Sequence, residues 1–176
     1  KGFPLIPVLI LLFIAFVAIF ADVLAPHDPQ IGSLARRFKP PVWQEGGSWA
    51  YLLGTDGQGR DMLSAIFYGL RVSLLVGVAS GLIALTLGGL LGVLAAYAGG
   101  RFEQVLMRIA DIQLGFPAIL VALILIAVLG KGVDKIIIAL VCVQWAYYAR
   151  TARSAALVER GKEYMEAARG LGLSRS

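Results

Sequence analysis

Long runs of apolar residues dominate this 176-residue chain and limit what it can fold into. The first run, from Phe3 to Ala25, has no charged residue before Asp22, and a second extends from Arg71 to Gly99. A helix of about 20 apolar residues crosses a bilayer core, and both runs are long enough. Because backbone polar groups in lipid must find partners within the protein, such runs predict membrane-spanning helices.

Composition agrees with a membrane protein and excludes other classes. Charged residues make up 15% and hydrophobic residues 59% of the chain, whereas soluble proteins carry about 25% charged residues. The net charge of +5 is spread over the ends of the apolar runs, so a nucleic-acid surface is not expected. A signal peptide is the rival interpretation of the first run, but the run is longer than a typical signal core.

The pattern predicts an all-α membrane protein with four transmembrane helices in this fragment. Residues 1–25 hold the first helix. Residues 26–70, rich in proline and glycine, form an extracytoplasmic insert that ends in a short interfacial helix, which Asp56 or Asp61 would cap. Residues 71–149 hold the three core helices, expected at 71–99, 105–129 with a kink at Pro117, and 136–149. Residues 150–176 form a polar, helical tail.

Small residues line one face of the second predicted span. They include two pairs at four-residue spacing, Gly77 with Gly81 and Gly88 with Gly92. In lipid such pairs let helix backbones approach closely. The stripe could serve packing within the subunit or could face a partner permease or the conduit. Elsewhere, Arg108 and Asp111 share a helical face and can pair, and Gln144 is expected to form an interhelical hydrogen bond.

The tail carries a short motif that resembles the first half of the EAA loop of bacterial ATP-binding-cassette (ABC) importer permeases. In that family the loop is the cytoplasmic handle held by the ATPase subunit. The resemblance assigns ATPase docking to Glu163, Glu166, Ala167, Ala168, Arg169, Gly170 and Gly172. The motif's second half would follow Ser176. A solvated amphipathic connector is the alternative interpretation of the string by itself.

A second segment, which precedes the second span, is similar to permeases of the dipeptide, oligopeptide and nickel importer family, and within it most similar to the C-type subunits of dipeptide permeases. Its Gly-Thr-Asp and Gly-Arg-Asp strings comprise Gly54, Thr55, Asp56, Gly59, Arg60 and Asp61. This resemblance implies a type I ABC importer permease that has six helices in full. Peptide, glutathione, nickel and opine importers share the framework, so the substrate stays open.

The resemblance implies the transmembrane subunit of an ATP-driven importer of short peptides or related solutes in the bacterial cytoplasmic membrane. Its implied partners are a homologous permease, two cytoplasmic ATPases and an extracytoplasmic binding protein. No P-loop is present, so ATP and Mg²⁺ are expected on the ATPases and no enzyme activity on this chain. With one histidine and one cysteine, no metal site is expected. The rival hypotheses are an ATP-independent secondary transporter and a membrane scaffold.

Overall fold

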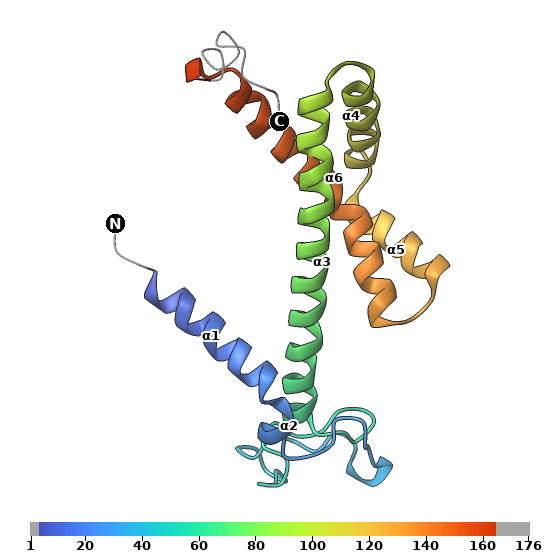
Figure 1. The fold of residues 1–176 in the computed structure, drawn as a ribbon. Helices are drawn as coiled ribbons and strands as arrows, with labels where there is room; N and C mark the ends of the chain where they lie inside the picture. Colours follow the sequence, from blue (N-terminus) through green and yellow to red (C-terminus); the bar gives the residue numbers. More distant parts are fainter. Residues whose placement is uncertain (1–3, 165–176) are drawn as a thin grey trace. The chain divides into compact units, whose positions relative to one another are not determined.

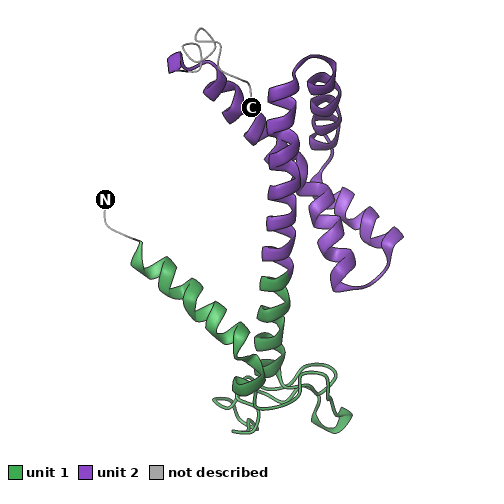
Figure 2. Ribbon diagram, in the orientation of Figure 1, with its two compact units in different colours: residues 1–75 green, residues 76–176 purple. Residues whose placement is uncertain are grey.

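The computed structural model describes residues 4–164, and helices make up most of this part of the chain. The β pairing among these residues consists of two isolated bridges, Ser48 with Tyr51 and Thr55 with Asp61. In chain order the helices are α1 (Leu5–Ile19), α2 (Ala21–Leu24), the 3₁₀ helix η1 (Leu34–Arg36), α3 (Met62–Ala98), α4 (Gly100–Leu114), α5 (Ala118–Leu129) and α6 (Val133–Arg160) (Figure 1). The chain divides into two compact units, residues 1–75 and 76–176, with the boundary inside α3 (Figure 2).

Of the described helices, α3 is the clearest membrane span. It has 37 residues, and at 1.5 Å per residue it is about 55 Å long, well beyond a hydrocarbon core of about 30 Å. The pair α4 and α5 qualifies as a second span only if the two are counted together, and α1 is a shorter apolar helix of 15 residues. The helical class is therefore confirmed for the described residues, whereas the count of four spans stays a prediction.

The first apolar run forms two helices, with a break at Phe20. The side chain of Arg71 fills this break. Its Nε donates to the carbonyl oxygen of Ala18 at 2.9 Å, its Nη2 donates to that of Ile19 at 3.0 Å, and it pairs with Asp22 at 2.8 Å. The last carbonyls of a helix lack partners within the helix, so a guanidinium placed there satisfies them. Arg71 thereby joins the end of α1 to α3 within the first unit.

The short helix expected from Asp61 to Leu70 is continuous with the span that follows it, and both belong to α3. Asp61 lies at the N-terminus of this helix, where its Oδ2 accepts hydrogen bonds from the backbone N–H of Ser64 at 3.1 Å and from the Ser64 hydroxyl at 2.5 Å. This geometry is that of a helix N-cap. Asp61 is 2% exposed, so the cap is buried within the insert.

The kink expected at Pro117 is a complete break. Helices α4 and α5 are bent by 92° where Gly115, Phe116 and Pro117 connect them. Proline has no backbone N–H to donate and disfavours a helical conformation at the residue before it, so α4 ends ahead of it and α5 begins after it. The predicted span 136–149 and the predicted tail helix after Arg150 are one uninterrupted helix, α6.

Small residues bring α3 and α6 into backbone contact within the second unit. A side chain at Gly88 would overlap the carbonyl oxygen of Trp145, and one at Gly92 would overlap that of Ala149. Ala84, Ala95, Ala146 and Ala149 are completely buried. Lipid provides no hydrophobic drive for helix association, so this close approach supplies the van der Waals contact that replaces it. At Gly77 and Gly81, in contrast, an added Cβ would meet no atom of residues 4–164 within 4 Å.

This difference gives a matched pair of substitutions. We expect Gly92→Ala to force α3 and α6 apart and to destabilise the protein by about 1–3 kcal/mol, the usual cost of overpacking. Gly81→Ala meets open space and is expected to leave stability unchanged or slightly higher. Thermal unfolding of the permease in detergent, followed by its helical circular dichroism, measures both. Equal melting temperatures for the two variants would contradict the packing role of Gly92.

Candidate functional site

The C-terminal part of α6 is fastened to the helices beside it by three arginines, which we name the arginine strap: Arg150, Arg153 and Arg160. Arg153 pairs with Glu103 at the start of α4, with an Nη2–Oε1 distance of 2.5 Å and an Nε–Oε1 distance of 2.6 Å. Two nitrogens of one guanidinium therefore contact one carboxylate whose side chain is only 19% exposed. Charge-assisted contacts of this kind are among the stronger side-chain interactions.

The other two strap residues bind at different points. Arg160 donates to the carbonyl oxygen of Ala96, one of the last carbonyls of α3, where a cation is also favoured by the helix dipole. Arg150 pairs with Asp111 of α4 at 3.5 Å, and both side chains are more than half exposed, so this pair contributes less than the others. The strap thus connects α6 to the end of α3 and to both ends of α4.

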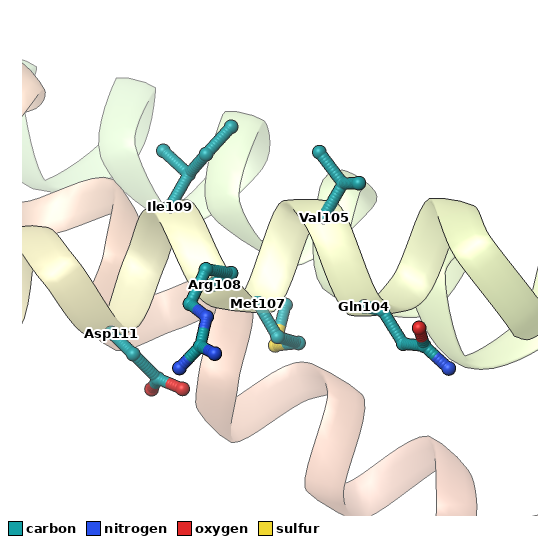
Figure 3. Close-up of a pocket in the computed structure, with 6 residues that line it drawn as sticks. All are labelled: Gln104, Val105, Met107, Arg108, Ile109 and Asp111. Carbon is teal, nitrogen blue, oxygen red and sulfur yellow. The ribbon is translucent and has the colours of Figure 1, made fainter.

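Arg108 and Asp111 lie on the same side of α4, as the sequence predicts, and Val105 and Ile109 lie on the other (Figure 3). The ion pair that Asp111 makes within residues 4–164 is nevertheless with Arg150 of α6 and not with Arg108. Arg108 and Asp111 line an open groove of about 520 Å³ along α4. Asp111, on the polar side of the groove, pairs with Arg150 of the strap. Val105 and Ile109, on the apolar side, are exposed.

Gln113 is a site residue that sequence reasoning missed. It lies at the end of α4, one turn before the break at Pro117. Its Nε2 donates to the carbonyl oxygens of Cys142 and Val143 in α6, at 2.5 and 3.2 Å, and its Oε1 accepts from the indole N–H of Trp145 at 2.9 Å. We call these three bonds the Gln113 knot. They connect α4 and α6 directly beside the bend.

The expected role of Gln144 falls to Gln113 instead. Gln144 is half-buried and has no side-chain hydrogen bond within the described part of the chain. Trp145, the next residue, donates its indole N–H to the knot. A glutamine in an otherwise apolar neighbourhood was the available signal, but nothing in the sequence links position 113 to positions 142–145.

The residues assigned to ATPase docking lie mostly beyond the described residues. Glu166, Ala167, Ala168, Arg169, Gly170 and Gly172 all fall outside residues 4–164. Glu163 is described and exposed, just after the end of α6. Next to Arg160 of the strap, Glu159 pairs with Lys162 at 2.7 Å and accepts from the hydroxyl of Tyr164. These two contacts lower the pKa of the Glu159 carboxyl.

The segment before α3 folds into a compact turn that brings its predicted residues together. Asp56 accepts from the backbone N–H groups of Gln58 and Arg60, at 2.8 and 3.0 Å, and pairs with the Arg60 guanidinium at 2.6 Å. The backbone N–H of Arg60 and its side chain lower the pKa of Asp56 to about 2. Asp56 is therefore charged at neutral pH, and it closes the turn while Asp61 caps the helix.

Glycine and threonine are needed at specific places in this turn. Gly54 and Gly59 have φ angles of +77° and +71°, which favour glycine, and a side chain at Gly59 would overlap the carbonyl oxygen of Ser33. The Thr55 hydroxyl is buried, accepts from the backbone N–H of Lys39 at 2.9 Å and donates to the carbonyl oxygen of Arg36. Thr55 thus joins the turn before α3 to the earlier part of the insert around Arg36 and Lys39.

We expect Gln113→Leu to remove all three bonds of the knot and to destabilise the packing of α4 on α6 by roughly 2 kcal/mol, since interhelical hydrogen bonds in membranes average about 0.6 kcal/mol each. Trp145→Phe removes one bond and should cost less. Gln144→Leu is the matched control, because Gln144 makes no such bond. Denaturant titration in mixed micelles measures all three, and a control as destabilising as Gln113→Leu would contradict the assignment.

Comparison with known proteins identifies what the chain resembles. Residues 88–176, half of the chain, match the model of the family described as "Binding-protein-dependent transport system inner membrane component". This region includes Gly88, Gly92, the Gln113 knot and the arginine strap.

Individual relatives are similar over most of the chain. The di/tripeptide transport system permease protein DppC of Pseudomonas aeruginosa is 41% identical over 93% of this chain and 54% of its own length. The dipeptide permease DppC of Escherichia coli K12 is 41% identical over 90% of this chain and 53% of its own. The glutathione permease GsiD of Pectobacterium atrosepticum is 36% identical over 93% and 52%. The chain therefore spans about half the length of these relatives.

Proposed function

Because the chain belongs to the family of inner membrane components of binding-protein-dependent transport systems, we propose that it is part of the membrane-spanning subunit of an importer driven by separate ATPases. Short peptides are the proposed cargo, since the relatives are named as permeases for di- and tripeptides, dipeptides and glutathione. A binding protein would deliver the peptide, and a homologous permease would complete the conduit.

The observation that carries this proposal is the continuity of α6. One helix of 28 residues includes the predicted fourth span and extends past it to Arg160, only a few residues before Glu163 and Glu166. A turn at Gly161 and Lys162 separates α6 from Glu163, but no turn interrupts the helix itself between Val133 and Arg160. A displacement that an ATPase applies at the end of α6 would therefore pass along the whole helix. Alternating access requires such a mechanical connection between the ATP-driven element and the membrane helices.

The strap and the knot extend the connection to other helices. Through Arg153 and Glu103, α6 is held to the start of α4, and through Gln113 it is held to the end of α4. These two attachments make α4 and α6 move together. The break at Pro117 sets α5 at its own angle to α4, while α5 packs against α6 as well. We propose that the bend is the place where motion of α6 alters the conduit.

Two substitutions separate docking from coupling. In the full-length protein, Glu166→Lys reverses a charge in the proposed ATPase contact and should weaken ATPase association and peptide uptake together. Arg153→Gln breaks the strap and should leave association intact while lowering the number of peptides taken up per ATP hydrolysed. Co-purification with the ATPases and uptake into proteoliposomes measure the two effects.

The control for charge reversal is Glu45→Lys, which changes an exposed acid in the insert and should preserve both association and uptake. Normal association and uptake with Glu166→Lys would refute the docking assignment. It would favour a secondary transporter or a scaffold, which need no ATPase contact at this position.

Site-directed labelling tests the proposed topology. In a Cys142→Ser background, cysteines replace Gln58 in the turn before α3 and Val158 near the end of α6, both exposed. An impermeant maleimide should label position 58 in intact cells and position 158 only after lysis. Labelling of both positions from outside would refute an extracytoplasmic insert combined with a cytoplasmic tail.

A further inference from the structure

The insert contains a small pocket that none of the roles above uses. Its volume is about 180 Å³, below the range of about 300–1,000 Å³ typical of sites for drug-sized ligands, so only a small molecule fits. Five ionisable side chains line it: His27, Asp28, Arg36, Tyr51 and Asp61. All of them lie within the first unit.

Asp61 lies beside the His27 ring. The side chain of Asp61 is 1% exposed, and its Oδ2 lies 3.6 Å from His27 Nδ1. Among the residues that the structure describes, neither Asp61 Oδ1 nor His27 Nδ1 has a hydrogen-bond partner, although both atoms are buried. A buried polar atom without a hydrogen bond is costly, so a polar ligand that reaches these atoms would be favoured.

The ring is also held in place. It stacks on Tyr51 with 4.8 Å between ring centroids, and the backbone N–H of His27 donates to the Ser64 hydroxyl at 3.1 Å. The His27 ring therefore has a fixed position at the pocket wall.

The two other charged residues have opposite signs. Arg36 donates one N–H to the Tyr51 hydroxyl, and its guanidinium lies 5.6 Å from the centre of that ring. A guanidinium has five N–H groups, so others remain for a ligand. The Asp28 carboxylate is exposed, and its Oδ1 accepts from the backbone N–H of Gln30 at 2.8 Å.

We propose that this pocket binds a small zwitterion with an ammonium and a carboxylate group, the size of an amino acid or the smallest dipeptides. Arg36 pairs with the ligand's carboxylate, and Asp28 accepts from its ammonium group. A guanidinium and a carboxylate that line one pocket match a ligand with both charges, whereas a simple cation or anion meets one repulsive group. The described residues include no group of three metal-ligating side chains, so a metal ion is not the expected occupant.

The pocket chemistry stands by itself, but its role as an early contact for a transported peptide rests on the proposed function. A binding protein that releases a dipeptide at the insert would place it beside a site that recognises both of its charged ends. Such a site would favour short free peptides over blocked ones.

The test measures binding without transport. The full permease, assembled with its ATPases in lipid nanodiscs and without binding protein, is titrated with alanyl-alanine by saturation-transfer NMR. Two blocked analogues serve as probes: N-acetyl-alanyl-alanine lacks the ammonium group, and alanyl-alanine amide lacks the carboxylate. We expect each to bind at least fivefold more weakly than the free dipeptide.

Two variants locate the site. Arg36→Gln should weaken binding of the free dipeptide about fivefold or more and remove its advantage over the amide. Asp28→Asn should make the affinity for the free dipeptide equal to that for the acetylated analogue. The substitution keeps the side-chain oxygen that accepts from the backbone N–H of Gln30. Arg37→Gln is the matched control, because that guanidinium donates to the carbonyl oxygen of Gly57 at 2.6 Å and does not line the pocket.

Equal binding of the free and blocked dipeptides, or equal affinities for Asp28→Asn and Arg37→Gln, would overturn the proposal. Asp28→Asn decides the matter even if loss of the Arg36–Tyr51 bond disturbs the fold. A complex that binds as expected and fails to transport would count against the proposed function and leave the pocket intact.

Discussion

The close approach of α3 and α6 at Gly88 and Gly92 is the contact on which the second unit depends. Because these positions carry no side chain, the backbone of α6 around Ala149 lies directly against α3. That distance allows the Arg160 guanidinium to reach the last carbonyls of α3 and Arg153 to reach Glu103. Bulkier residues here would separate the helices, and the polar contacts, which act over a few ångströms, would be lost with them.

The first unit depends on a comparable arrangement of polar groups around helix ends. Arg71 satisfies the carbonyls at the end of α1, and Asp61 satisfies the N–H groups at the start of α3. Between them, the Asp56 turn closes the chain before α3 through bonds among residues 56–60. The insert is thus ordered mainly by side chains that complete the hydrogen bonding of backbone ends, since it offers few buried apolar residues.

Local patterns in the sequence predicted the features that depend on local physics. The apolar run after Arg71 predicted α3, Asp61 was one of the two residues named as a cap, and Pro117 marked the interruption. Of the two glycine pairs, Gly88 with Gly92 marked a close-packing face. The continuity of α6 was missed because the change from apolar to polar residues near Ala149 suggested a boundary. Backbone hydrogen bonds within a helix do not depend on that change, so the helix passes through it.

The break at Phe20 and the Gln113 knot could not be predicted for a different reason. Each depends on a partner far away in the chain: Arg71 is about 50 residues from the carbonyls it binds, and Gln113 about 30 from its partners. A single sequence, considered without an alignment, contains no signal for such distant pairs. The residues assigned to docking after Tyr164 lie outside the described part of the chain, so their roles continue to rest on resemblance.

The unbroken length of α6 has a mechanical consequence. A helix of 28 residues is about 42 Å long, so a tilt of about 5° around one end displaces the other by roughly 4 Å. That sideways displacement exceeds the shifts of about 1–2 Å by which helices at interfaces change their contacts. A small angular change at one end of α6 can therefore change the contacts at its other end, and stiffness, rather than a large movement, provides the amplification.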